Sequence, residues 1–318
     1  AETALRRLEA IEPGRGAVRR LALRRARGEL DAALFLLRTT RIAELKPAAA
    51  AAVFGPHSAP AREESATRPG YAPNETLLSA AIRLTDEPAQ AHLAAQSLAP
   101  YTEDPLALTL AGDLFLIAQD ESAAAARYDA ALVRAPDFAA AFEGRIRVDV
   151  RAGNLRAARE RLEDRLAARP EDAGVRLMLA RALRGLEDAE SAARVLREDD
   201  RLAARPEAAL VYAHLIADSA PEALRAFAIE ARRTIPNTPE SVEILWLAGF
   251  DEEAASAARN ALIAAPKDAQ RAQAYAEAMA RIDRARDGAA FLEALLRANP
   301  ESDGARAAIG ILRAGGEL

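Results

Sequence analysis

The chain has 318 residues, a formal net charge of −5 and a hydrophobic fraction of 51%. An acidic balance of this kind argues against a protein that holds nucleic acid by bulk electrostatics. The absence of cysteine excludes disulfides and thiol nucleophiles, and no apolar run reaches the length of about 18 residues that a membrane-spanning helix needs.

Aromatic residues make up only 4% of the chain, so its core has to be built mainly from alanine, leucine, isoleucine and valine. Alanine is the strongest helix former, and the sequence has neither alternating strand patterns nor a hairpin dipeptide such as Asn-Gly. The composition therefore predicts an all-helical protein. Arginine greatly outnumbers lysine, which occurs only at Lys46 and Lys267, and this bias is typical of a GC-rich bacterial genome.

Residues 1–47 are predicted to form two helices that divide near Gly28. Arginines interleave with leucine and alanine in the first of them, which favours the exposed face of an amphipathic helix over a docking patch. Four prolines interrupt residues 48–73, so this segment is expected to be an exposed loop or linker, either passive or a contact element. The start at Ala1, without methionine, suggests a trimmed precursor and weakly favours export, although a truncated chain would begin in the same way.

Two helices are expected over 105–118 and 121–135, because apolar residues recur there at helical spacing. The residues that should pack between them are Leu108, Gly112, Phe115, Ala124, Tyr128 and Ala131. The small residues would let two backbones approach, and the aromatic rings would fill the space beside them. Asp104 is a natural N-cap in front of a proline at the first helical position, and Pro136 ends the second helix, where Asp137 can cap the next.

This spacing resembles the tetratricopeptide repeat, whose period is about 34 residues. A weaker pair precedes it, with helices expected over 75–84 and 88–98, and a second good copy ends at Pro170. From Pro136 onward, closing prolines at 170, 206, 236, 266 and 300 give intervals of 34, 36, 30, 30 and 34 residues. The two 30-residue units lack about one helical turn and are expected to be short pairs rather than broken helices.

The resemblance implies an all-α fold, a right-handed α-solenoid of stacked antiparallel helix pairs, because one pair buries only one face and needs neighbours on both sides. The expected divisions are a degenerate first repeat at 1–47, the loop or linker at 48–73, the repeat solenoid at 74–302 and a capping segment at 303–318. Pro136, Pro170 and Pro300 mark the ends of the best-matching repeats. The capping helix is expected over 303–313.

The resemblance also implies a binding surface, since in this family the first helix of each pair lines a concave groove. The matching positions chosen as candidates for partner binding are Asp113, Leu116, Glu143, Arg147, Arg151, Leu177, Arg181 and Arg184. The carboxylate clamp of the family's chaperone-binding members is absent, since Thr109, Asp113 and Gly144 stand where it has a lysine and two asparagines.

The four candidate arginines lie on two successive first helices of an acidic chain. Arginine can hold a carboxylate with two parallel hydrogen bonds, so the cluster favours a protein or peptide partner with an acidic or mixed segment. The alternative is that Glu143, Asp149 and neighbouring acids neutralise these arginines.

The sequence contains no catalytic or cofactor constellation. His57, His92 and His214 are far apart and lack metal-binding spacing, and neither a phosphate loop nor a nucleophile elbow occurs. We therefore expect no enzyme activity, no cofactor, no metal and no nucleic-acid partner. The sole tryptophan, Trp246, is expected to pack in the core, with an exposed binding anchor as the alternative.

Three functions remain open. The first is a scaffold or adaptor that binds a partner protein, within a multi-protein complex such as a bacterial envelope, secretion or pilus-type assembly. The second is a regulatory repeat region of a larger enzyme, and the third is a self-assembling solenoid component. The expected setting is a soluble bacterial protein, with the periplasm or cell envelope slightly favoured over the cytoplasm.

Overall fold

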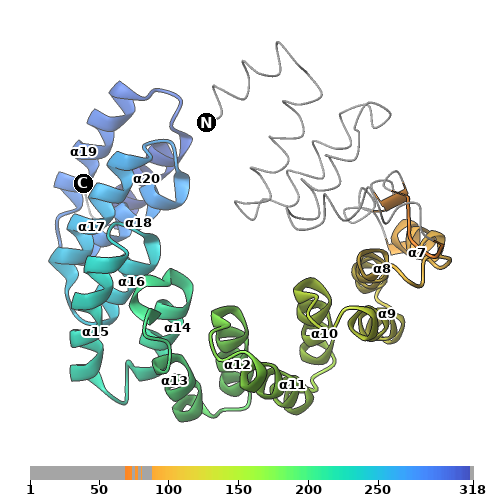
Figure 1. Cartoon of the computed structure of the whole chain (residues 1–318). Helices are drawn as coiled ribbons and strands as arrows, with labels where there is room; N and C mark the ends of the chain where they lie inside the picture. Colours follow the sequence, from red (N-terminus) through yellow and green to blue (C-terminus); the bar gives the residue numbers. More distant parts are fainter. Residues whose placement is uncertain (1–68, 74–75, 78–79, 81–87, 316–318) are drawn as a thin grey trace. The chain divides into compact units, whose positions relative to one another are not determined.

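The computed structural model describes residues 69–73, 76–77, 80 and 88–315, and within these residues it contains helices and turns but no strand (Figure 1). The helices of the first part are α7 (Pro88–Ser97), α8 (Pro105–Ile117), α9 (Glu121–Arg134) and α10 (Ala139–Arg151). They are followed by α11 (Leu155–Ala168), α12 (Ala173–Gly185), α13 (Ala189–Arg197), the 3-10 turn η4 (Leu202–Ala204), α14 (Pro206–Ile216), α15 (Pro221–Thr234), α16 (Pro239–Leu247), α17 (Asp251–Ala264), α18 (Ala269–Arg281), α19 (Ala285–Ala298) and α20 (Asp303–Gly315). The predicted all-helical fold is confirmed.

The chain divides into two compact units, Ala1–Asn154 and Leu155–Leu318. In unit 1, α8 packs on α7 and α9, and α10 packs on α9 and α8. In unit 2, each helix from α11 to α20 packs on the next one along the chain, and α14 also packs on α16. Each unit is therefore a stack of helices joined by short turns, the architecture of an α-solenoid. The first helices are α8 and α10 in unit 1 and α12, α14, α16 and α18 in unit 2, and the second helices are α9 in unit 1 and α11, α13, α15, α17 and α19 in unit 2.

One turn conformation follows the first helix in five of the described pairs. The second residue after that helix has a positive φ, between 56° and 77°, and these residues are Gln119, Gly153, Glu187, Gly249 and Asp283. The next N–H then bonds to a carbonyl five residues earlier, as from Asp120 to Phe115 at 2.9 Å. This is the Schellman motif, which satisfies carbonyls left free at the helix end. Only two of the five positions carry glycine, the residue that adopts this conformation without steric cost.

The core of unit 1 is closed by Tyr128 of α9, which lies between glycines of two neighbouring first helices. Tyr128 has no exposed surface, at 0%. A Cβ added to Gly112 of α8 would lie 2.6 Å from the ring carbon Cε1, and one added to Gly144 of α10 would lie 2.3 Å from the same carbon. Both distances are far inside van der Waals contact, so the ring requires glycine on both sides. The sequence pattern anticipated Gly112 but assigned Gly144 to the groove.

The other residues expected to pack in this repeat are also inside unit 1. Leu108, Phe115, Ala124 and Ala131 are all buried. The N-cap of α8 is Asp104, as expected, and its carboxylate accepts from the N–H groups of Leu106 and Ala72 at 3.1 Å each. The N-cap of α10 is Phe138, which makes no side-chain capping bond, and Asp137 lies one position before it. Pro136, Pro170 and Pro300 are exposed and follow α9, α11 and α19.

Unit 2 corrects one of the proline assignments. Pro206 begins α14 instead of ending the third pair, whose second helix stops at Arg197 and is followed by η4. Pro221 and Pro239 begin α15 and α16, as expected from their positions. Both helices form in each of the two 30-residue units, as expected. In the second unit the missing length lies in the first helix, since α16 has 9 residues and α18 has 13. The helix expected over 303–313 is α20, which packs on α18 and α19.

Several predictions fall outside the described residues. These are the first repeat at 1–47, nearly all of the linker at 48–73, and His57 within it. The helix expected over 75–84 is described only at residues 76–77 and 80, which are helical, whereas the helix expected over 88–98 is α7.

Candidate functional site

Three polar side chains meet where α8 and α10 of unit 1 lie together. The hydroxyl of Tyr128 donates to Oδ1 of Asp113 at 2.7 Å, and Nη1 of Arg147 donates to the same oxygen at 3.4 Å. Burial raises the pKa of Asp113, although both donors oppose this shift. Burial and the charge of Asp113 raise the pKa of Tyr128, so the hydroxyl stays protonated and continues to donate. Arg147 thus pairs with a half-buried carboxylate while 54% of its own side chain is exposed.

Arg151, one turn after Arg147 on α10, also has an acidic partner. Its Nε lies 3.4 Å from Oε1 of Glu121, and 45% of its side chain is exposed. Asp149 instead accepts from Arg145 at 2.5 Å. Neighbouring acids therefore neutralise the two candidate arginines of unit 1, Asp113 at Arg147 and Glu121 at Arg151.

The remaining candidates of unit 1 differ in exposure. Glu143 is exposed on α10, beside the two arginines. Leu116 is only 4% exposed and belongs to the hydrophobic core, so it offers little surface to a partner.

In unit 2, one ion pair and one histidine–carboxylate contact connect consecutive first helices. Arg181 of α12 donates to Glu207 of α14, and Nε2 of His214 lies 2.8 Å from Oε1 of Glu243, which joins α14 to α16. We call these two pairs the unit 2 ladder. Arg184, also on α12, is exposed and makes no ion pair with any described residue.

Leu177 is half-buried, one helical turn before Arg181 on α12. The first-helix face of α12 therefore offers an apolar side chain, one paired arginine and one unpaired arginine within two turns. Two of the four candidate arginines lie in unit 1 and the other two in unit 2.

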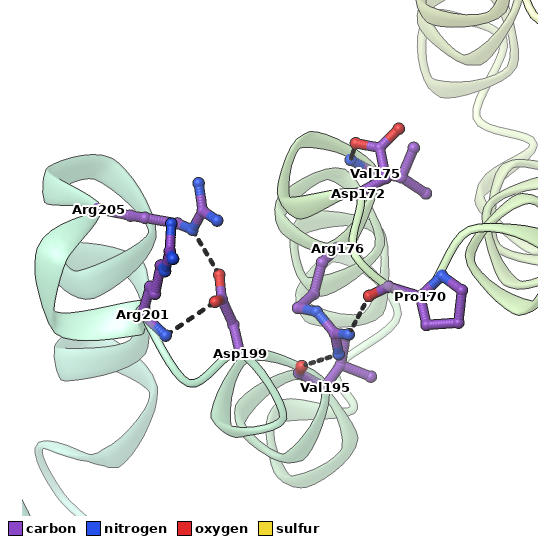
Figure 2. A network of polar contacts seen from close by, with 8 residues as sticks. All are labelled: Pro170, Asp172, Val175, Arg176, Val195, Asp199, Arg201 and Arg205. Carbon is purple, nitrogen blue, oxygen red and sulfur yellow. Dashed lines mark hydrogen bonds and ion pairs between the residues drawn. The ribbon is translucent and has the colours of Figure 1, made fainter.

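A buried arginine that the sequence analysis did not single out lies elsewhere on α12. Arg176 is 6% exposed, and its guanidinium donates to the carbonyls of Pro170 at 2.6 Å and Val195 at 2.8 Å (Figure 2). It also donates to Glu198 at 3.0 Å. Because three acceptors of its own unit occupy the guanidinium, we interpret Arg176 as a structural link between the α11–α12 turn and α13.

A cavity of about 320 Å³ opens beside Arg176. Four of its charged side chains are already paired, since Arg176 pairs with Glu198 and Asp199 lies 2.6 Å from Nε of Arg205. Asp199 also accepts from the backbone N–H of Arg201 at 2.9 Å (Figure 2). The contact from Arg176 to Pro170 recurs at Arg306, which donates to the carbonyl of Pro300 at 2.7 Å. An arginine six residues after a closing proline is the sequence signal for this link.

Within the described residues, no group of three or more His, Asp or Glu side chains could hold a metal ion. No helix in that part of the chain has the length and apolarity to cross a bilayer. His92 lies edge-on to Phe115 at 5.5 Å and bonds to Gln96 at 2.9 Å. Trp246 is half-buried, with the guanidinium of Arg281 5.6 Å from its ring, so it combines a packing contact with partial exposure.

No protein-family model and no curated protein matches the sequence. Among solved structures, a thermophilic tetratricopeptide repeat protein of Thermus thermophilus is 22% identical, with a TM-score of 0.40 over 55% of this chain and 98% of that chain. A tetratricopeptide repeat protein of Parabacteroides merdae is 13% identical, with a TM-score of 0.39 over 93% of this chain and 97% of that chain. The APC/C hetero-tetramer Cut9–Hcn1 matches at 15% identity and a TM-score of 0.43, over 91% of this chain and 59% of that chain.

Helix pairs follow one another through both units, and the same turn recurs after the first helix in five of the described pairs. In unit 1 Tyr128 of the second helix packs against Gly112, as the spacing predicts, and also against Gly144 of the next first helix, which the spacing did not predict. These features make the chain a helical repeat protein, consistent with the tetratricopeptide repeat family.

Proposed function

We propose that the chain is a non-catalytic scaffold or adaptor that binds a segment of a partner protein along the exposed faces of its first helices. One observation carries the proposal: polar side chains of neighbouring first helices form half-exposed pairs that a ligand can replace. Such pairs are Arg147–Asp113 in unit 1 and Arg181–Glu207 in unit 2.

The energetics support replacement. Exposed ion pairs contribute only about 0–1 kcal/mol, because water screens them and the side chains lose freedom. The side chains of Arg181 and Glu207 are 44% and 66% exposed. A partner carboxylate can therefore take the place of Glu207 at small cost, and the unpaired Arg184 offers a second donor close by. The opposite charges of Arg181 and Glu207 suit a segment of mixed charge that carries acidic residues.

Two variants of unit 2 test the proposal. The double change Arg181→Glu with Glu207→Arg keeps an internal ion pair but reverses its direction, so the fold is preserved while a bound carboxylate meets a like charge. Arg184→Glu reverses a charge that has no internal partner. Arg232→Glu is the matched control, because Arg232 is an exposed arginine on the second helix α15.

In affinity capture from the native host, the wild-type chain and the Arg232→Glu control should retain the same partner. The ladder swap and Arg184→Glu should each reduce its recovery by about tenfold or more, since like charges at an interface are strongly unfavourable. A partner that both variants retain would contradict binding at this face. For unit 1, Arg147→Gln is preferable to a glutamate, which would meet the half-buried Asp113.

We further propose that the complex is a bacterial assembly of the envelope, secretion or pilus type. The arginine-rich and lysine-poor composition supports a GC-rich bacterial host. Identification of the captured proteins by mass spectrometry tests this setting. Recovery of additional copies of the chain alone would contradict the adaptor role and support self-assembly.

A further inference from the structure

Unit 2 contains a second place where a partner can be held, away from the first-helix ladder. It is a cavity of about 330 Å³ lined by α17, α18 and α19, and we call it the aromatic pocket. Its apolar lining consists of the buried Ala255, Tyr275 and Met279 and the half-buried Ile282 and Phe291. The rings of Tyr275 and Phe291 meet edge to face at 5.1 Å. The volume of the aromatic pocket is at the lower end of the range for ligand pockets, so the pocket suits one large side chain better than an extended ligand.

The guanidinium of Arg259 lies over this lining. Its Cζ is 4.7 Å from the centre of the Phe291 ring, a cation–π arrangement that holds the side chain in place. No described residue forms an ion pair or a side-chain hydrogen bond with Arg259. The other arginine of the pocket, Arg284, is already held by Asp287 at 2.8 Å. Arg259 is therefore the available donor, and stacking leaves its N–H groups free to grip a carboxylate.

The acidic residues of the pocket do not occupy this donor. Asp287 is paired with Arg284, and Glu252 lies seven residues before Arg259 on α17, about 10 Å away along the helix. An apolar ligand group in the pocket thus lies between the positive charge of Arg259 and the negative charge of Glu252. A ligand carboxylate next to that apolar group finds its partner in Arg259.

The same three residue types recur two helix pairs earlier. Arg259 and Arg197 are each the ninth residue of their helix, and Tyr275, Phe291, Tyr212 and Phe227 are each the seventh of theirs. The rings of Tyr212 and Phe227 also meet edge to face, at 4.9 Å. Burial raises the pKa of both Tyr212 and Tyr275, and the charges of Arg197 and Arg259, respectively, oppose this rise. In α15, the second helix that lies between α13 and α17, the ninth residue is Ile229 instead of an arginine. The arrangement therefore occurs at every second helix pair of this part of the stack.

We propose that the aromatic pocket binds a short motif of a partner polypeptide in which a large apolar side chain is followed by an acidic residue. The apolar side chain packs on Tyr275, Met279 and Phe291, and the carboxylate accepts from the guanidinium of Arg259. This site lies on α17, α18 and α19, whereas the first-helix site proposed above uses α12 and α14. Changes at Arg181 or Arg184 therefore test the first-helix site, and changes at Arg259 test the pocket.

The test uses the full chain and three blocked peptides: acetyl-Gly-Gly-Phe-Asp-Gly-Gly-amide, its Phe-Asn counterpart without the charge, and its Ala-Asp counterpart without the ring. Binding is followed by NMR, through the side-chain Nε–H signals of arginine and the methyl signal of methionine. The Phe-Asp peptide should bind about tenfold more tightly than either counterpart, since each lacks one of the two contacts. It should also shift the signals of Arg259 and Met279.

Arg259→Ala should weaken Phe-Asp binding by about tenfold, and Arg286→Ala should leave it unchanged. Arg286 is the matched control, because it is an exposed arginine on α19 that does not line the pocket. Circular dichroism confirms that each variant is folded. Equal affinity for the Phe-Asp and Phe-Asn peptides, unchanged binding by Arg259→Ala, or no saturable shift up to about 5 mM peptide would overturn the proposal.

Discussion

Replacement of Gly144 by alanine should destabilise unit 1, although the same change normally stabilises a helix. Gly144 lies inside α10, and alanine is favoured over glycine by about 0.5–1 kcal/mol at such positions. The added Cβ would lie 2.3 Å from Cε1 and 2.4 Å from Cζ of Tyr128. Carbon atoms in good contact are about 3.5–4.0 Å apart, so the ring or the helix has to move by more than an ångström.

The ring of Tyr128 cannot move away from the added Cβ, because it is confined on its other side. Gly112 approaches it from α8, where an added Cβ would also lie only 2.6 Å away, and its hydroxyl is held by Asp113 at 2.7 Å. Overpacking of this kind costs about 1–3 kcal/mol. After subtraction of the helix-propensity gain, the free energy of unfolding of the region around α10 should fall by about 1 kcal/mol, and by no more than about 2.5 kcal/mol.

Hydrogen exchange measured by mass spectrometry on peptides from α8 to α10, together with thermal melts, gives this free energy. The matched control is Gly310→Ala in α20, where an added Cβ meets no atom within 4 Å. That change should raise stability by about 0.5–1 kcal/mol, so the two substitutions should have opposite signs. If Gly144→Ala raised stability as well, the packing of Tyr128 between two glycines would be refuted.

Three further predictions concern stability. Gln119→Gly should stabilise unit 1 by about 1 kcal/mol, because the residue has a φ of 62°, and a lower melting temperature would contradict this. Arg176→Gln should cost about 2–3 kcal/mol in urea unfolding, because the buried Arg176 donates to three acceptors that lose this donor, whereas the exposed Arg306→Gln should cost less than about 1 kcal/mol. The raised pKa of Asp113 means that the folded state binds the carboxyl proton more tightly than the unfolded state does. The stabilisation that comes from this proton is complete below a pH of about 4 and is lost as the pH rises through the folded pKa of Asp113. The melting temperature of Asp113→Asn, compared with wild type, should therefore rise between pH 4 and pH 7, and a constant difference would exclude this titration.

The fold could be predicted because helix pairs impose a strong and repeated pattern. The apolar spacing around Leu108 and Tyr128 marks two helix faces, and prolines mark helix boundaries. A proline is ambiguous, however, since it fits the first turn of a helix as well as the segment after one. Pro206 was therefore assigned to the wrong boundary, and only the insertion of η4 after α13 resolves it.

The packing of α10 was harder to predict for a geometric reason. Alignment with the first repeat places Ile146, not Gly144, at the position of the small residue. The point at which α10 meets the ring of Tyr128 depends on the angle between the helices, which residue spacing does not encode. The second glycine therefore remained among the groove positions.

The candidate site was predictable only at the level of helix faces. Arg181 pairs with Glu207, which lies 26 residues later in the sequence. Such pairs depend on the distance between helices and on side-chain rotamers, which the sequence pattern does not give. Arg176 looks like any other arginine by composition. It lies three and seven residues before Leu179 and Leu183, however, on the buried face of α12, and this position could have identified it as a structural residue.

The sole tryptophan gives the protein a built-in spectroscopic reporter. Trp246 lies on α16, and its ring is contacted by Arg281 of α18, which in turn pairs with Asp251 of α17 at 3.3 Å. Its fluorescence therefore reports on the junction of three consecutive helices in unit 2, without any label. Loss of this junction would bring water to the indole and shift its emission to longer wavelength. Selective excitation of tryptophan can thus follow the opening of unit 2, while circular dichroism records the helices of both units together.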